Sequence, residues 1–323
     1  MFLESLEKTR QKNTIEGVII LKEVLLLGLG AVGASIAAQF YDAGYPINII
    51  CDADRKARYS RDGFSVNNKN YKFTYFTNRE YKKSADLVLI AVKYHHLKDA
   101  LPQLEGLIGE KTVIISLLNG IDSEEIISNY FKCENNIAPA FIYKIDATKV
   151  NNAVNYYSKG IIVFGEKNGM VTEKINKVKN IFDMAGIKYE ISDNILKKIW
   201  WKYMTNIGFN QTTAILKVPY RALQEIQYAQ ELAKEAMNEV VLISQSTNIN
   251  INLSKEDISR AMEMLKQLDP DGKTSMMQDV EAKRKTEVEM FSGKLCQMGD
   301  SLNISTPINR MLYNLIRTIE ETY

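Results

Sequence analysis

The first half of the chain alternates short, almost wholly apolar runs with longer amphipathic segments. Apolar runs of strand length occur at 24–27, 47–52, 85–93 and 112–120, with helix-like segments between and after them. Strands that are apolar at successive positions are typical of parallel sheets buried on both faces, and their alternation with helices is typical of α/β folds. The pattern predicts a doubly wound domain, completed by a hairpin over 153–166 around Ser158–Lys159–Gly160, a helix over 171–184 and a strand over 187–191.

The second half has a different sequence pattern, because almost no strand-like segments occur after Asp193. Helix-period segments run over 193–216, 221–247, 254–268, 275–299 and 306–321, separated by Pro219, the turn-forming stretch 268–275 and Pro307. We therefore expect an N-terminal extension over 1–21, a Rossmann-type α/β domain over 22–192, and an all-helical domain over 193–323.

Composition narrows the function classes. The 323 residues include 41 Lys plus Arg and 39 Asp plus Glu, a balance that argues against a nucleic-acid surface. No apolar run reaches the ~18 residues that a membrane-spanning helix needs. Cys51, Cys133 and Cys296 lack metal-ligand spacing and fit a reducing cytosol, so we expect a cytoplasmic protein. With only two histidines in the sequence, we expect no metal site.

One glycine-rich turn points to a cofactor. Gly28, Gly30 and Gly33 follow an apolar strand and open a helix, and this spacing in this context is typical of dinucleotide binding. The glycines let the backbone approach a diphosphate, and the helix N-terminus supplies N–H groups and a positive dipole. The alternative is a simple tight turn. The loop residues that we expect to bind the cofactor are Gly28, Leu29, Gly30, Ala31, Val32 and Gly33.

Asp52 ends the second apolar run, 19 residues after Gly33. A carboxylate in this place can accept both ribose hydroxyls and would repel a 2′-phosphate, which favours NAD(H). Four basic residues follow it and could instead meet a phosphate, or could form a solvated helix face. These are Arg55, Lys56, Arg58 and Arg61. The cofactor preference therefore stays open.

Two polar residues lie at the carboxyl ends of later strands, where open α/β sheets bind their ligands. Lys93 closes "LIAVK", and we expect it to contact the cofactor or the substrate. Asn119, in "SLLNG", is expected to contact both. The alternatives are a strand-end lysine that reaches into water and ordinary turn chemistry for an asparagine before a glycine.

A stripe of three polar residues interrupts the apolar stretch 200–214. Lys202, Asn206 and Asn210 recur every four residues, which places them along one face of a helix. An ammonium held against apolar surroundings has a lowered pKa and can donate a proton near neutral pH, so Lys202 is the candidate acid. The two amides can bind a substrate or fix the lysine. The alternative is a solvent-reaching lysine with two structural amides.

The segment 274–293 supplies two further candidates. Glu287 is expected to share a helix face with Met290, Phe291 and Lys294, where a carboxylate could orient substrate or steady Lys202. Ser275, at an expected helix start, offers a hydroxyl and neighbouring N–H groups to a substrate carboxylate. The alternatives are a solvated glutamate and an N-capping serine.

Together these residues resemble the ketopantoate reductases (2-dehydropantoate 2-reductases) over nearly the whole chain from about residue 22. The resemblance rests on Gly28–Gly33 with its helix, "AVK" ending at Lys93, "LLNG" at 117–120, "WKYMTNIGFN" at 201–210, "SMMQDVEAKRKTE" at 275–287 and "TPINRMLYNLI" at 306–316. It implies a Rossmann-type domain followed by an all-α domain like the C-terminal domain of 6-phosphogluconate dehydrogenase.

The resemblance also implies roles. Lys202 would be the general acid that protonates a ketone oxygen as hydride arrives from a nicotinamide, and Glu287 would complete the catalytic group. Asn119 and Asn206 would position substrate and lysine, and Ser275 would bind the substrate carboxylate. The implied reaction is the NADP(H)-dependent reduction of 2-dehydropantoate to D-pantoate, in the biosynthesis of pantothenate and coenzyme A.

The chain departs from the family pattern at two positions, which keeps alternatives open. Asp52 stands where many members carry an arginine, which keeps NAD(H) plausible, and Tyr220 stands where some carry an asparagine. An alternative function is an NADH-dependent D-2-hydroxyacid dehydrogenase acting on branched-chain or aromatic 2-oxo acids. Another is a non-catalytic, dinucleotide-sensing regulatory protein, which would have no need of an acid such as Lys202. The expected partner is a small 2-oxo acid, and the long amphipathic helices could form a homodimer interface or internal core.

Overall fold

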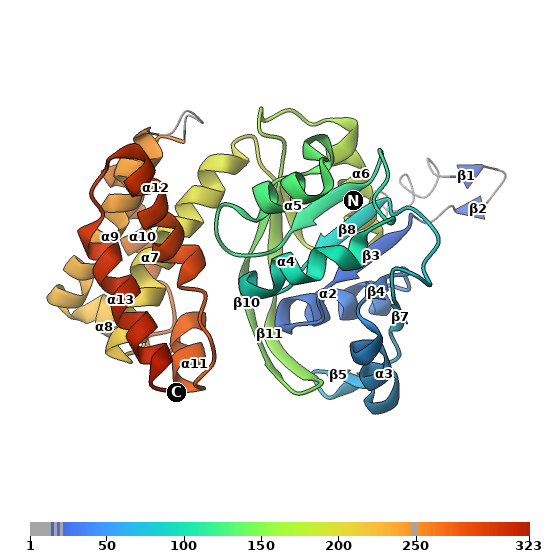
Figure 1. Cartoon of the computed structure of the whole chain (residues 1–323), viewed down its shortest axis with the longest axis horizontal. Helices are drawn as coiled ribbons and strands as arrows, with labels where there is room; N and C mark the ends of the chain where they lie inside the picture. The colour runs from blue at the N-terminus through green and yellow to red at the C-terminus, as the bar shows by residue number, and fades with distance from the viewer. Residues whose placement is uncertain (1–13, 16–17, 20–21, 247–250) are drawn as a thin grey trace. The chain divides into compact units, whose positions relative to one another are not determined.

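A computed structural model describes residues 14–15, 18–19, 22–246 and 251–323 (Figure 1). The chain divides into two compact units. The first ends at Ile195, and the second comprises Leu196–Tyr323 together with the short segment Asn119–Ile121. Most of the expected extension over 1–21 lies outside the described residues. Its described part forms a two-stranded antiparallel sheet of β1 (Thr14–Ile15) and β2 (Val18–Ile19).

The first unit is built around a parallel sheet, as the apolar runs predict. Its five strands lie in the order β7-β4-β3-β8-β9, and each neighbouring pair is parallel. The doubly wound α/β prediction is confirmed, whereas the edge strand β7 was not predicted. The strands span Thr74–Phe76 (β7), Asn48–Ile50 (β4), Val24–Leu27 (β3), Leu87–Ile90 (β8) and Val113–Ser116 (β9).

The parallel sheet is buried on both faces, because successive residues of a strand point to opposite sides. In β3, Val24 and Leu26 pack in one cluster with residues of α2 (Ala31–Asp42) and α6 (Glu173–Ala185). Leu25 and Leu27 belong to the cluster of the other face. That second cluster draws on η1 (Tyr94–His96), α4 (Leu97–Ala100), η2 (Leu101–Leu104) and α5 (Ser123–Phe131).

A second sheet in this unit corrects the hairpin prediction. Its long antiparallel pair is β10 (Ala140–Val150) with β11 (Ala153–Phe164), so the chain turns at 151–152 and not around Ser158–Lys159–Gly160. Asn151 takes a left-handed φ of 52°, which asparagine tolerates better than most residues. The sheet also contains β5 (Phe64–Val66), β6 (Lys69–Tyr71) and β12 (Tyr189–Ile191), and α2 packs against both long strands.

In the described residues from Leu196 onward every regular element is a helix, as predicted. Three helices match the expected segments, and none of the described helices is long and apolar enough to cross a membrane. The matching helices are α7 (Ile195–Leu216), α10 (Lys255–Leu265) and α13 (Pro307–Glu321).

Two of the expected long helices are broken. The segment 221–247 forms α8 (Tyr220–Glu225) and α9 (Gln227–Ser246), because Ile226 adopts an extended ψ of 112°, which a β-branched residue favours. The segment 275–299 forms α11 (Ser275–Glu281), the π-helix η4 (Glu289–Gly293) and α12 (Lys294–Leu302). Lys283 has a left-handed φ of 51°, which ends α11 and begins the intervening loop.

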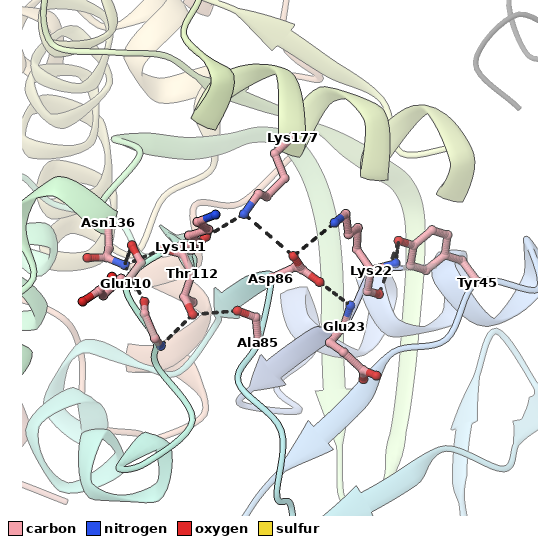
Figure 2. A network of polar contacts seen from close by, with 11 residues as sticks. Lys22, Glu23, Tyr45, Ala85, Asp86, Glu110, Lys111, Thr112, Asn136 and Lys177 are labelled. Carbon is pink, nitrogen blue, oxygen red and sulfur yellow. Dashed lines mark hydrogen bonds and ion pairs between the residues drawn. The ribbon is translucent and has the colours of Figure 1, made fainter. Parts of the chain in front are cut away.

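A polar network closes the amino edge of the parallel sheet. Figure 2 shows Asp86, just before β8, which accepts a 3.0 Å hydrogen bond from the Glu23 backbone N–H, just before β3. The same carboxylate forms ion pairs with Lys22 at 3.6 Å and with Lys177 at 3.8 Å. These bonds satisfy backbone groups where the strands begin, so the amino edge is a structural edge and the carboxyl edge is left for ligands.

Asn136 anchors the start of β9 in this network. Its amide Nδ2 donates to the carbonyl of Thr112 at 2.7 Å and to the carbonyls of Gly109 and Glu110 at 3.0 and 3.3 Å. Asn136→Ala should therefore lower the free energy of unfolding by about 1–3 kcal/mol, since it leaves buried acceptors unpaired. The exposed neighbour Asn135 provides the control, and Asn135→Ala should change the unfolding free energy by less than about 0.5 kcal/mol. Urea unfolding followed by circular dichroism measures both, and equal losses would contradict the assignment.

Candidate functional site

The glycine-rich turn after β3 is shaped by two very close backbone approaches. Gly28 has a φ of +101°, and a Cβ there would lie 2.7 Å from the carbonyl oxygen of Ala91. A Cβ on Gly33 would lie 2.0 Å from the Gly28 carbonyl oxygen. At Gly30, by contrast, the nearest atom would be 3.7 Å away. The first and third glycines therefore hold the turn together, and the second leaves open space above it.

That open space faces the N-terminus of α2. Gly30 is the N-cap and offers no side-chain acceptor, and the first turn of α2 contains no acidic residue. The first N–H groups of a helix lack partners within the helix and carry its positive dipole. Backbone N–H groups at Ala31 and Val32 with no competing carboxylate suit a diphosphate. The Leu29 side chain is buried, and its backbone carbonyl accepts a 2.7 Å hydrogen bond from Lys149 Nζ.

Asp52 follows the second strand of the parallel sheet and begins the next helix. It lies two residues beyond β4 and forms the N-cap of α3 (Ala53–Asp62), where its Oδ1 accepts a 2.7 Å hydrogen bond from the Arg55 backbone N–H. Its Oδ2 lies 3.2 Å from the Arg55 guanidinium. The carboxylate is thus held by its own helix, because an aspartate at an N-cap satisfies an otherwise unpaired N–H group.

The other basic residues of α3 have separate partners. Lys56 pairs with Glu80, and Arg61 pairs with Asp62. The Arg58 guanidinium lies over the ring of Tyr59, 5.2 Å from its centroid. The positive charges of Arg58 and Arg55 both lower the pKa of Lys149.

Lys93 and Asn119 both follow strands of the parallel sheet, at its carboxyl edge. Lys93 lies three residues beyond β8, is exposed, and forms the N-cap of η1. Asn119 lies three residues beyond β9, yet by its contacts it belongs with the second unit. Asn119 therefore contacts residues of the second unit, Lys202 and Glu287.

Asn119 links the two charged candidates. Lys202 Nζ donates a 2.8 Å hydrogen bond to Asn119 Oδ1, and Asn119 Nδ2 donates a 3.4 Å hydrogen bond to Glu287 Oε2. An ammonium can only donate and a carboxylate can only accept, so one orientation of the amide satisfies both neighbours. The structure therefore brings together three of the predicted residues, which come from distant parts of the sequence.

The surroundings of Lys202 tune its acidity. The side chain is partly buried on α7, and the loss of water lowers the pKa of its ammonium to about 8, while the negative charge of Glu287 acts in the opposite direction. An amine with this pKa is still largely protonated at neutral pH and gives up its proton readily. The arrangement can therefore donate a proton to an oxygen placed beside Lys202.

The remaining predicted residues of the second unit lie on α7 and α11. Asn206 is half-buried and Asn210 is 7% exposed, and neither side chain has a hydrogen-bond partner among the described residues, so both amides can bind a ligand. Ser275 is the exposed first residue of α11, not its cap. The cap is Thr274, which accepts from the Met277 N–H.

Tyr220 takes part in shaping the loop that leads to Ser275. Its backbone N–H donates a 3.0 Å hydrogen bond to the Gly272 carbonyl, and its ring lies so close that a Cβ on Gly272 would approach it to 3.1 Å. Tyr220 thus contacts the loop that leads to Ser275 through both its backbone and its ring.

Glu287 is held by a loop that sequence periodicity did not predict. It lies between α11 and η4, not on a continuous helix. The preceding Thr286 donates through its N–H and its hydroxyl to Glu320 Oε1, both at 2.7 Å, which fixes the loop to α13. Tyr203, next to Lys202, donates a 2.6 Å hydrogen bond to the Phe291 carbonyl in η4. Thr286, Glu320 and Tyr203 were missed because each acts through a long-range contact that leaves no local pattern.

No group of His, Cys, Asp and Glu residues that could hold a metal ion occurs in the part of the chain that the structure describes. The three cysteines, all described, are free.

Two family models match the chain in succession. Ketopantoate reductase PanE/ApbA matches residues 24–169, and Ketopantoate reductase PanE/ApbA C terminal matches residues 194–320. A 2-dehydropantoate 2-reductase of Archaeoglobus fulgidus is 25% identical over 300 residues, which are 93% of this chain and 98% of that protein.

Solved structures share the fold over most of their length. D-mandelate dehydrogenase with NADH and anilino(oxo)acetate has a TM-score of 0.82 at 21% identity, and the match covers 93% of this chain and 99% of that chain. A dimeric ketopantoate reductase from Staphylococcus aureus has a TM-score of 0.74 at 20% identity, with the same coverage of 93% and 99%.

The different surroundings of Gly33 and Gly30 predict opposite phenotypes. Gly33→Ala should lower the free energy of unfolding by about 1–3 kcal/mol, since the new methyl group overlaps the Gly28 carbonyl. Gly30→Ala should cost less than about 1 kcal/mol of stability, yet weaken binding of NADH and NADPH by about tenfold or more, because the methyl group fills the open space. Thermal unfolding and fluorescence titration measure the pair. A stable Gly33→Ala, or a Gly30→Ala that binds normally, would contradict the assigned roles.

Proposed function

The chain belongs to the ketopantoate reductase family, and from this premise we propose that it reduces 2-dehydropantoate to the 2-hydroxy acid D-pantoate with NAD(P)H. The observation that carries the proposal is the partly buried Lys202 ammonium, bonded to Asn119 near Glu287. A protein that only senses a dinucleotide has no need of a lysine tuned to release its proton.

The residues divide the chemistry between them. A bound nicotinamide would supply the hydride that the carbonyl carbon of the substrate receives. Lys202 donates its proton to the carbonyl oxygen, so that hydride and proton together convert the ketone to an alcohol, and the neutral amine regains a proton from water. A cationic donor aimed at the developing alkoxide lowers the barrier because the charge is already in place.

Positioning falls to the amides and the loop hydroxyl. Asn119 keeps the ammonium directed while Glu287 holds the far side of the amide. Asn206 and Asn210, with unpaired amides on the same helix as Lys202, bind polar groups of the substrate. Ser275, exposed at the start of α11, binds the substrate carboxylate.

The cofactor-binding residues are proposed to act through the turn after β3. The N–H groups of Ala31 and Val32, beside Gly30, would hold the diphosphate, and Gly28, Leu29 and Gly33 shape the turn. Lys93 lies at the carboxyl edge of the same sheet, where it would contact the cofactor. We favour NADP(H), because the Asp52 carboxylate is engaged by Arg55 and is not free to select a ribose diol.

We further propose a cytoplasmic homodimer. The free cysteines fit a reducing compartment, and a related ketopantoate reductase from Staphylococcus aureus is dimeric. Light scattering of the purified protein measures the assembly directly.

A second candidate function is the NADH-dependent reduction of branched-chain or aromatic 2-oxo acids. It is favoured by Tyr220 beside the loop that carries Ser275 and by the likeness to D-mandelate dehydrogenase. A spectrophotometric panel of 2-dehydropantoate, 2-oxoisocaproate and phenylglyoxylate with both cofactors separates the two. We expect the highest kcat/KM with 2-dehydropantoate. Preference for phenylglyoxylate would support the second candidate, and no turnover with any substrate would favour a sensor.

The pH dependence of the reaction tests the acid. Lys202 must be protonated to act, so kcat/KM should fall as the pH rises through its pKa of about 8. Glu287→Gln removes the charge that raises this pKa, so the alkaline fall should move to lower pH. Lys202→Met should reduce kcat/KM by ~10²–10⁴ and abolish that fall.

The exposed Lys217, just beyond α7, serves as the control, and Lys217→Met should leave the profile unchanged. Near-normal turnover in Lys202→Met, or an alkaline fall that moves upward in Glu287→Gln, would refute the assigned roles.

A further inference from the structure

A second partly buried lysine, Lys149, lies at the glycine turn. It is the penultimate residue of β10, far from the turn in sequence, and its Nζ donates a 2.7 Å hydrogen bond to the Leu29 carbonyl. The ammonium also lies over two rings, 5.3 Å from the centroid of Phe64 and 5.8 Å from that of Tyr59. The strand β10 thus places a positive charge between the glycine turn and α3.

This charge has no anionic partner within the described residues. No carboxylate lies within ion-pair distance of Lys149 Nζ, and the charges that act on it are the cations Arg58 and Arg55. Partial burial and these two cations lower the pKa of Lys149 to about 8. A desolvated ammonium surrounded by like charge is unfavourable by itself, so an incoming anion would relieve it.

The neighbouring carboxylate does not cancel this charge. Both oxygens of Asp52 are engaged by Arg55, one by its N–H at 2.7 Å and one by its guanidinium at 3.2 Å. That pair is neutral as a unit. Among the described residues, Lys149 and Arg58 therefore remain as two cations beside Tyr59 with no carboxylate paired to them.

We propose that Lys149 and Arg58 bind the 2′-phosphate of NADP(H), so that a residue of the β10–β11 hairpin sets the cofactor preference of this chain. The inference rests on the proposed use of a nicotinamide dinucleotide. In this fold the diphosphate lies at the N-terminus of the first helix, and the adenosine ribose lies toward the end of the second strand. Lys149 lies between those two places, next to the Leu29 carbonyl on one side and to the α3 ring of Tyr59 on the other.

The same contacts allow a purely structural role, in which Lys149 fastens the hairpin to the turn. The two roles differ in what they discriminate. A lysine with a purely structural role would raise the affinity for every dinucleotide equally. A lysine that binds the phosphate would raise the affinity for the 2′-phosphorylated form alone. The ratio of affinities for phosphorylated and unphosphorylated ligands is therefore the decisive quantity.

The test is equilibrium binding of four probes by calorimetry: NADP⁺, NAD⁺, adenosine 2′,5′-bisphosphate and 5′-AMP. Wild type should prefer the first and third over their partners that lack the 2′-phosphate. Lys149→Met keeps the stem over the rings and removes the charge. It should weaken NADP⁺ and the bisphosphate by about 10- to 100-fold, with less than about threefold change for NAD⁺ and 5′-AMP.

Two further variants keep the result interpretable. Lys149→Arg should retain most of the preference, and Arg58→Met should lose part of it even if Lys149→Met folds poorly. Lys144→Met is the matched control, because Lys144 lies on the same strand, is exposed, and also stands over a ring, that of Tyr143. It should bind all four probes as wild type does.

Equal weakening of all four probes in Lys149→Met would make the lysine a fastener and overturn the proposal. So would a wild-type protein that binds 5′-AMP as tightly as the bisphosphate. These measurements need no turnover, so their outcome is separate from that of the substrate panel. A chain that reduces no 2-oxo acid but loses its NADP⁺ preference in Lys149→Met would refute the proposed reaction and keep this assignment.

Discussion

The cluster of Lys202, Asn119 and Glu287 depends on keeping one partly buried ammonium hydrogen-bonded. Lys202 loses water on α7, and the Asn119 side chain replaces that water as an acceptor at 2.8 Å. Because the same amide must direct its N–H₂ group elsewhere, it also fixes Glu287 on its other side. A single uncharged side chain thus orders an acid and a carboxylate that lie 85 residues apart in sequence. An amide in this place keeps its charge state at every working pH, so the ordering does not change as Lys202 gains and loses a proton.

The parts of the fold that sequence predicted correctly are those set by local physical rules. Strands buried on both faces are apolar at almost every position: β3 and β8 are wholly apolar, and β9 is apolar up to its last residue, the buried Ser116. The glycine turn follows from sterics, since the Gly33 position cannot hold a Cβ. The prediction of the hairpin turn was wrong because the outer half of β10 alternates exposed and half-buried residues. A strand of this kind has no run of apolar residues to mark it in the sequence. The chain turns at Asn151, which adopts a left-handed backbone conformation. The prediction placed the turn at Ser158–Lys159–Gly160 instead, because that stretch is also polar and contains a glycine.

The site shows the same division between local and long-range causes. The four-residue spacing on α7 was enough to single out Lys202, Asn206 and Asn210, because a helix presents that spacing on one face. The surroundings of Glu287 could not be predicted from periodicity. Helix-forming residues surround it, yet Glu320 on α13 binds both polar groups of Thr286 and holds the chain in a loop. Tertiary hydrogen bonds here outweigh a helix propensity of a few tenths of a kcal/mol per residue, roughly, and a π-helix absorbs the change of register at η4.

Cofactor preference illustrates why one residue at the end of a strand is a weak guide. The rule that an acidic residue there selects the ribose diol assumes that its carboxylate is free. In this chain the same residue can cap a helix, and capping satisfies an N–H group that would otherwise lack a partner. Once Asp52 is held by Arg55, the local charge is set by side chains that reach the same space from other elements. Charge acts through space and not through sequence, so Lys149, 97 residues further along the chain than Asp52, adds its charge beside the glycine turn and α3.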